Sequence, residues 1–408
     1  MDRARRSVQR ALQLKPRLLR AQAAQGFLLA YGEPPDPAGA ERVLREVLAQ
    51  DPNMSDALNW LNSALSSQGR EKEARQVLER AALIDPLHPA VALNLADRLL
   101  EEGQTNRAQH IYERLLEQPT PSPMAYFAVS GVYRSTGRLI ELNATHKSLV
   151  LADPSFGNLF FLMLSYAVLG DWPQAESVNE RLMRVTPQGP GRIVRRVMMP
   201  GFRGQTDVAV RRLREALEEQ RLTIAELGRE EKIIAGTHFA RGGDYAAAIE
   251  ALEPVVDVES PGSSVMPGGF SHGGHALAWG YLHTGADTKA ARLLAAEARE
   301  CSSARAAGRP SDSWDLYRCA ETELLRGNIE QALSIFERAI DAGWRDYYLR
   351  ERDPYWASVA NDGRYRALMA KVKADVDRQR ADVQRIDARD DFFAKLDAAI
   401  AAKATPGP

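Results

Sequence analysis

Apolar and polar positions follow a helical period through residues 55–88, with one interruption. Leu58, Leu61 and Leu65 are spaced three and four residues apart, which places their side chains on one face of a helix. Gly69 then breaks the pattern, and glycine is the residue that a left-handed helix end favours. A second apolar face follows it, made of Ala74, Val77, Leu78 and Ala81. The pattern predicts two amphipathic helices joined by a tight turn.

The same unit recurs with a period near 34 residues. Its turn glycines lie 34, 34 and 33 residues apart and are Gly69, Gly103, Gly137 and Gly170. Five positions after each of them stands Ala74, Ala108, Leu142 or Ala175. Alanine at this point is explained if it lies where the two helices cross, because a larger side chain would push them apart. A fixed period with a helix–turn–helix inside it is typical of a repeat solenoid.

Less regular units extend this array in both directions. The later turn glycines are Gly204, Gly243, Gly285 and Gly327. At the other end, residues 6–16 read as the closing helix of a unit whose first helix is missing. We therefore expect nine whole helix pairs plus a leading half. Because no convincing strand alternation is present, the predicted fold class is all-α.

The pattern of the best unit resembles that of a known family. In order along the chain, its marked positions are Leu58, Leu61, Gly69, Ala74, Leu78, Ala81 and Pro86. They are similar to the tetratricopeptide-repeat (TPR) motif. The resemblance implies a right-handed α-solenoid, with regular repeats over residues 55–189 and longer, irregular repeats over residues 190–344. We expect residues 1–344 to form the superhelix and residues 345–408 to form C-terminal capping helices and a tail.

The segment after the last repeat carries a second resemblance. Residues 339–380 are similar to the end of TPR regions in multidomain bacterial signalling proteins, where a winged-helix or nucleotide-cyclase domain precedes the repeats. The resemblance implies a bacterial regulatory scaffold, with a fusion domain or a complex partner before the leading half repeat. Five aromatic side chains would cover the open end of the solenoid, since terminal repeats need a cap: Trp344, Tyr347, Tyr348, Tyr355 and Trp356.

Composition and motifs narrow the function classes. A formal net charge of -1 argues against a general nucleic-acid binder, and no apolar run is long enough to insert into a membrane. Cys301 and Cys319 support neither a disulfide framework nor a cysteine-rich zinc site. Phosphate-loop, nucleophilic-serine and zinc-protease motifs are absent from the sequence. We expect a non-enzymatic protein without a cofactor in the cytoplasm, or in the periplasm if it belongs to a membrane-anchored longer protein.

The family resemblance implies a partner site on the concave face, built mainly from the first helix of each unit. The corresponding residues are Asn59, Trp60, Asn94, Phe127, Arg134, Phe160, Phe161 and Leu164. Only Asn94 fits the carboxylate clamp of chaperone-binding TPR domains, and the paired cations of that clamp are missing. Aromatic anchors suit a hydrophobic helix or an extended peptide of another protein. The competing interpretation is that Phe160, Phe161 and Leu164 pack between neighbouring repeats.

One further helix places histidines in a stripe on the groove side: His272, His275, Trp279 and His283. His275 and His283 are eight residues apart, about 12 Å along a helix axis, so they cannot share one ion. His272 and His275 could share one, but no third ligand is fixed by the sequence, and we predict no metal site. The alternative to a scaffold is a sensor segment that binds a small ligand or metal here. Seven arginines within residues 192–214 are either a patch for an acidic partner or solvated helix faces.

Overall fold

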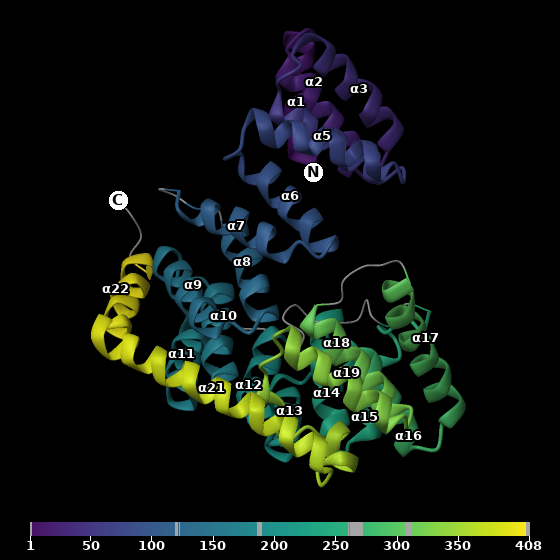
Figure 1. Ribbon diagram of the computed structural model, residues 1–408, viewed down its shortest axis with the longest axis vertical. Helices are drawn as coiled ribbons and strands as arrows, with labels where there is room; N and C mark the ends of the chain where they lie inside the picture. Colours follow the sequence, from purple (N-terminus) through teal and green to yellow (C-terminus); the bar gives the residue numbers. More distant parts are fainter. Residues whose placement is uncertain are drawn as a thin grey trace. The chain divides into compact units, whose positions relative to one another are not determined.

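The computed structural model describes residues 2–118, 121, 123–185, 190–259, 261, 272–306 and 312–404. The chain divides into two compact units, Met1–Val129 and Ser130–Pro408. Both units consist of paired helices, most of which are labelled in Figure 1. The described residues contain no β-strand, so the prediction of an all-α solenoid of helical repeats is confirmed.

The amino-terminal unit begins with the predicted half pair and continues with three whole pairs. Its helices are α1 (Asp2–Leu14), α2 (Leu19–Tyr31), α3 (Pro37–Gln50), α4 (Ser55–Ser66), α5 (Glu71–Ile84), α6 (Pro89–Glu101), α7 (Thr105–Leu116) and the first part of α8 (Pro123–Ser135). Its core lies between the helices of each pair and the next first helix, where Leu44, Leu61 and Leu65 are almost fully buried.

The carboxy-terminal unit continues the same pairing. Its repeat helices are the rest of α8, α9 (Leu139–Ala152), α10 (Phe156–Val168), α11 (Trp172–Val185), α12 (Pro190–Phe202), α13 (Thr206–Gln220), η1 (Ile224–Glu226), α14 (Arg229–Arg241), α15 (Tyr245–Leu252), α16 (Gly273–His283), α17 (Asp287–Ala306), α18 (Ser313–Leu325) and α19 (Ile329–Ala342). The final elements are α20 (Tyr347–Arg350), η3 (Pro354–Val359), α21 (Gly363–Asp390) and α22 (Phe392–Ala404).

The turn inside each pair is made as the glycine spacing predicts. All eight predicted turn glycines have a positive φ, between 66° and 83°. At the first of them the backbone N–H of Arg70 donates to the carbonyl of Leu65 at 3.0 Å, which satisfies a carbonyl at the helix end. A residue with a Cβ is strained in this conformation, which explains why glycine recurs at these positions.

The predicted helix crossings are also confirmed. The alanines that follow the turn glycines have no exposed surface: Ala74, Ala108, Ala175, Ala209, Ala248, Ala290 and Ala332. Leu142 takes the same place in the α8–α9 pair and is 2% exposed. The small side chains let the two helices of a pair approach closely. Alanine therefore recurs in the sequence at the position where each helix pair packs most closely.

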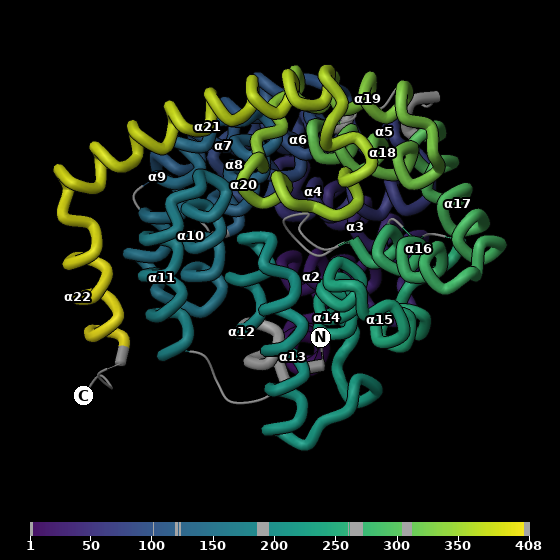
Figure 2. Tube along the Cα trace, turned by 90° about the horizontal axis from the view of Figure 1, so that it is seen from below, coloured from purple at the N-terminus to yellow at the C-terminus, as the bar shows by residue number. Residues whose placement is uncertain are grey.

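The segment after α19 does not extend the solenoid but returns through the carboxy-terminal unit. In Figure 2, α20 lies between α10 and α18, and α21 runs from α19 back toward α9. Gln379 of α21 joins it to the α8–α9 turn: its amide accepts from the backbone N–H of Leu139 at 2.8 Å and donates to the carbonyl of Gly137 at 2.9 Å. Residues 345–404 therefore pack within this unit, and the boundary expected at residue 344 stays a prediction.

One expectation from the sequence was wrong. Cys301 of α17 and Cys319 of α18 form a disulfide, with their Cα atoms 5.9 Å apart. Two cysteines 18 residues apart carry no signal of their pairing, because it depends on how the two helices pack.

Among the described helices, none combines the length and the apolar character that a membrane crossing requires.

Candidate functional site

The first helices of the carboxy-terminal unit surround residues 344–359 of the same chain. The guanidinium of Arg134, near the end of α8, donates to the carboxylate of Asp346 at 2.7 Å and lies 4.3 Å from the ring centre of Trp314 on α18. The first and last pairs of this unit therefore meet where Arg134 covers Trp314, and Asp346 binds Arg134 at this point. Gly343 fits against the backbone of Thr136, since a Cβ there would lie 2.4 Å from its carbonyl carbon.

A second buried carboxylate anchors the same segment farther along. Asp353 receives Arg241 of α14 at 3.0 Å and Arg350 of α20 at 2.9 Å, and all three side chains are largely shielded from water. A buried ion pair is expensive to break, because the remaining charge is left without a partner in a poorly solvated place. These pairs therefore fix the segment to α14.

Aromatic side chains fill the space between these ion pairs. The indole N–H of Trp356 donates to the hydroxyl of Tyr317 at 3.0 Å, and the Trp344 ring stacks on Tyr317 at 4.7 Å. Tyr355 lies 5.3 Å from the ring of Trp279 on α16. Trp344, Tyr355 and Trp356 are at most 3% exposed, so the inner face of this unit is a packed core built partly from its own C-terminal segment.

Several residues expected in a partner groove belong to this core. Arg134 is 9% exposed and Leu164 is 3% exposed. Phe160 and Phe161 are half-buried, with rings 5.5 Å apart, and Phe161 lies 5.8 Å from the ring of His146. Burial, followed by the charge of nearby Arg134, lowers the pKa of His146 to about 3. These contacts favour packing between repeats for this group; partner contact by these residues stays untested.

The remaining groove predictions fall in the amino-terminal unit. The Trp60 ring of α4 lies 5.3 Å from Phe27 of α2, which in turn lies 4.8 Å from Tyr31. Tyr31 is 46% exposed, and its hydroxyl donates to Ser63 Oγ at 2.5 Å. Sequence reasoning missed Phe27 and Tyr31, although both stand on a first helix four residues apart. The three rings form one partly exposed aromatic surface, which we call the α2–α4 aromatic surface.

An amide pair continues this face to the next repeat. The Asn94 side chain of α6 donates to the side-chain oxygen of Asn59 on α4 at 2.7 Å. Asn59 is buried, whereas Asn94 is half-buried, so part of the Asn94 side chain reaches solvent. Phe127 of α8 is also half-buried. First helices α2, α4 and α6 thus carry rings and amides in register along one side of the unit.

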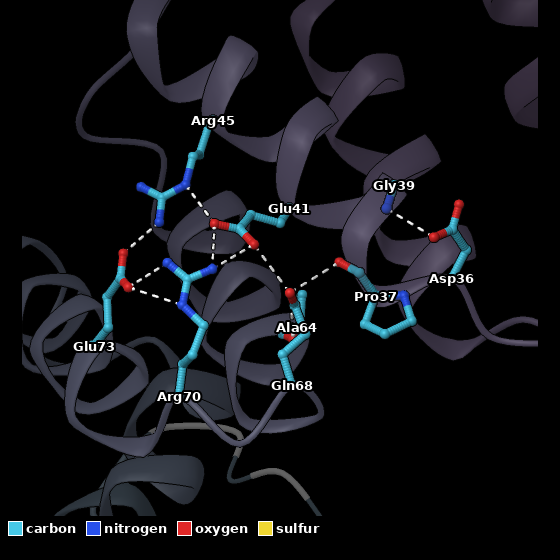
Figure 3. Close-up of polar contacts among 9 residues, drawn as sticks. All are labelled: Asp36, Pro37, Gly39, Glu41, Arg45, Ala64, Gln68, Arg70 and Glu73. Atoms are coloured by element: carbon cyan, nitrogen blue, oxygen red, sulfur yellow. Dashed lines mark hydrogen bonds and ion pairs between the residues drawn. The ribbon is translucent and has the colours of Figure 1, made fainter.

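An ion-pair network holds the second helices of this unit together (Figure 3). Glu41 of α3 accepts from Arg45 at 2.8 Å and from Arg70 at 2.8 Å, while Gln68 donates to it at 3.0 Å. Glu73 of α5 pairs with both arginines. The hydrogen bond from Arg45 is the main reason that the pKa of Glu41 falls to about 2. The network ties α3, the α4–α5 turn and α5 into one support for the first helices.

The histidine stripe divides into two places. His272 and His275 stack with ring centres 4.1 Å apart, and both approach Glu297 of α17. His283 instead stacks on Tyr245 at 4.4 Å and is exposed. Glu297 was not identified from the sequence, because it lies on a different helix 22 residues after His275 with no motif to mark it.

Burial governs the charges of this cluster. It lowers the pKa of His272 well below the usual value, with the neighbouring His275 and three arginines acting in the same direction. Burial also raises the pKa of the Glu297 carboxyl. The polar side chains of His272, His275 and Glu297 are therefore buried away from water.

Comparison with known proteins agrees with the repeat architecture. The family model described as tetratricopeptide repeat matches residues 23–93 and 65–126. Cellulose synthase operon protein C of Pseudomonas fluorescens is 27% identical over 203 residues, which are 48% of this chain and 16% of that protein. The uncharacterized protein y4yS of Sinorhizobium fredii is 35% identical over 109 residues, which are 26% of this chain and 57% of that protein. The chain thus spans less than two thirds of the length of either relative.

Solved structures that match this chain do so at low identity and with TM-scores below 0.5. A tetratricopeptide repeat protein from Parabacteroides merdae has a TM-score of 0.48 at 14% identity, covering 64% of this chain and 98% of its own. The human IFIT1 dimer with m7Gppp-AAAA has a TM-score of 0.39 at 16% identity, covering 79% of this chain and 72% of its own.

The family-model match over residues 23–126 and the helix pairs with their glycine turns and alanine crossings support a place in the tetratricopeptide-repeat family. Solenoids of this kind present extended surfaces to other proteins. The chain accordingly has the architecture of a protein-interaction scaffold.

Proposed function

We propose that the chain holds a peptide or amphipathic helix of another protein against the first helices of its amino-terminal unit. The α2–α4 aromatic surface would provide the anchors, and the Asn59–Asn94 pair would hydrogen-bond to backbone groups of the bound segment. Binding energy in such interfaces is usually concentrated in a few aromatic positions. Tyr31, with 46% of its surface exposed, supports a role for this face in contact with a partner.

The observation that carries the proposal is the contrast between the two units. In the carboxy-terminal unit, the faces of the first helices are covered by residues 344–359 of the chain itself, through three buried aromatic rings and two carboxylates. First-helix faces of this array can therefore hold an aromatic segment. The proposal assigns the corresponding role in the amino-terminal unit to a segment of another protein.

The relatives support the class of function rather than a particular process. The match to cellulose synthase operon protein C covers 16% of that protein, so a role in cellulose synthesis is not carried over. The proposal also includes that the chain is not an enzyme and that it acts in a bacterial regulatory system. For the compartment, the Cys301–Cys319 disulfide favours the periplasmic alternative over the cytoplasm, because disulfides persist in oxidising surroundings.

The test begins with a photo-crosslinking amino acid in place of Tyr31 in the native host, followed by mass spectrometry of the crosslinked product. The partner found in this way is then produced and titrated against the purified chain. Trp60→Ala should weaken binding by about 2 kcal/mol, while helix content by circular dichroism stays unchanged. A matched control is Glu79→Ala on α5, which should leave affinity within about 0.5 kcal/mol. Equal affinity of wild type and Trp60→Ala would contradict the proposal.

A further inference from the structure

His272, His275 and Glu297 form a compact set of metal-ligating side chains in the carboxy-terminal unit. One ligand atom from each lies within 4.8 Å of the other two. Glu297 and His275 have no exposed surface, and the His272 side chain is 10% exposed. Three donors this close and this shielded are unusual for surface charge, which is normally solvated.

All three residues also have a buried polar atom without a hydrogen-bond partner: His272 Nε2, His275 Nδ1 and Glu297 Oε1. His272 Nε2 and Glu297 Oε1 are 3.5 Å apart, longer than a normal hydrogen bond. Leaving one buried polar atom unsatisfied is costly, and three such atoms within one cluster of ligating side chains call for a common explanation. We propose that this point binds a divalent first-row transition-metal ion, with Zn²⁺ as the expected occupant.

The surroundings of His275 and Glu297 suit such an ion. The Thr322 hydroxyl donates to the carbonyl of Arg318 at 3.0 Å, so its hydrogen is committed and the 2.9 Å contact with His275 Nε2 has the imidazole as donor. His275 Nδ1, which lies 3.4 Å from Glu321 Oε2, then carries the lone pair that would ligate the ion. Arg318 donates to Glu297 Oε2 at 2.7 Å, which orients Oε1 toward the histidines. Outer partners of this kind fix the ligands of protein metal sites.

The backbone gives the carboxylate room to approach. A Cβ on Gly274 would lie 2.5 Å from Glu297 Oε1, so glycine at this position allows the carboxylate to reach the two rings. His272 requires one adjustment. Its Nδ1 accepts from the His275 backbone N–H at 3.1 Å; ligation through Nε2 places the ring proton on Nδ1, and the ring must turn away from that amide. The metal bond replaces this helix-capping hydrogen bond.

The donor types select the class of ion. Two imidazole nitrogens and a carboxylate oxygen suit Zn²⁺ and its first-row neighbours, whereas Ca²⁺ and Mg²⁺ prefer oxygen ligands throughout. Glu321 Oε2, 3.4 Å from His275 Nδ1, adds a second negative charge beside the site. The two carboxylates carry two negative charges beside the site, and Arg318, which pairs with Glu297, offsets one of them. This inference is independent of the proposed partner surface, which lies in the other unit.

The experiment uses the full chain without an affinity tag, stripped with EDTA and dialysed against ZnCl₂. Elemental analysis should find one tightly held Zn²⁺ per chain, and Co²⁺ in its place should give the visible absorption of a four- or five-coordinate site. Glu297→Gln should weaken Zn²⁺ binding at least about a hundredfold. The matched control is His283→Gln on α16, the helix of His275, which removes an exposed histidine outside the cluster and should leave the affinity unchanged.

Circular dichroism accompanies both variants, because Glu297 is buried and its replacement could unfold the repeat. The wild-type measurement does not depend on that outcome. If the wild-type chain retains less than one Zn²⁺ and shows only the spectrum of hydrated Co²⁺, the proposal is overturned. It is equally overturned if a folded Glu297→Gln chain binds Zn²⁺ as the wild type does, or if His283→Gln removes the binding.

Discussion

The ion pair between Arg134 and Asp346 should control the stability of the carboxy-terminal unit. Its side chains are only 10% and 2% exposed, the donor–acceptor distance is 2.7 Å, and Arg134 also covers the Trp314 ring. Replacing Arg134 with methionine preserves most of its volume but leaves the Asp346 carboxylate buried without this cation. Removing one partner of a buried pair typically costs about 3–5 kcal/mol, so we expect a loss of this size for Arg134→Met.

A double-mutant cycle separates the ion pair from simple packing loss. Arg134→Met combined with Asp346→Leu removes both charges, and the double variant should recover most of the loss, to within about 1 kcal/mol of the wild type. Urea unfolding followed by circular dichroism gives the free energies, with the transitions of the two units fitted separately. The control is Arg75→Met, which breaks partly exposed pairs with Glu79 and Glu102 and should cost less than about 1 kcal/mol. The reasoning is refuted if Arg134→Met loses no more unfolding free energy than this control. It is also refuted if the double variant loses as much as the two single variants added together.

Three further predictions follow from packing and burial. Ala108→Leu should overpack the α6–α7 crossing and lower the unfolding free energy by roughly 1–3 kcal/mol, which an unchanged thermal midpoint would contradict. A chain ending at Gly343 lacks three buried aromatic rings, so light scattering should show aggregation; a monodisperse product would remove their covering role. Burial lowers the pKa values of His146 and His238 to about 3. As the pH falls, these histidines therefore become protonated in the unfolded state at a higher pH than in the folded state. Stability should therefore fall as pH drops below about 6.5, by up to about 1.4 kcal/mol per pH unit for each histidine, and His146→Leu should reduce this slope in urea titrations.

The sequence by itself determined the repeat architecture, because each repeat is specified by local interactions. A left-handed turn requires glycine, and a close helix crossing requires alanine, so Gly69 and Ala74 can be interpreted without knowledge of the rest of the chain. The number of helix pairs followed from repeating that observation. Helix periodicity also identified the stripe that contains His272 and His275. Glu297, the third member of that cluster, could not be identified in the same way.

The tertiary structure decided what the inner faces of the repeats contact. Asp346 meets Arg134 across 212 residues, and Cys301 meets Cys319 between neighbouring pairs; neither contact has a period or a motif. Such contacts depend on the accumulated rotation from repeat to repeat and on the return of the C-terminal segment. Because small changes per repeat add up along a solenoid, no local pattern in the sequence records where its distant parts meet.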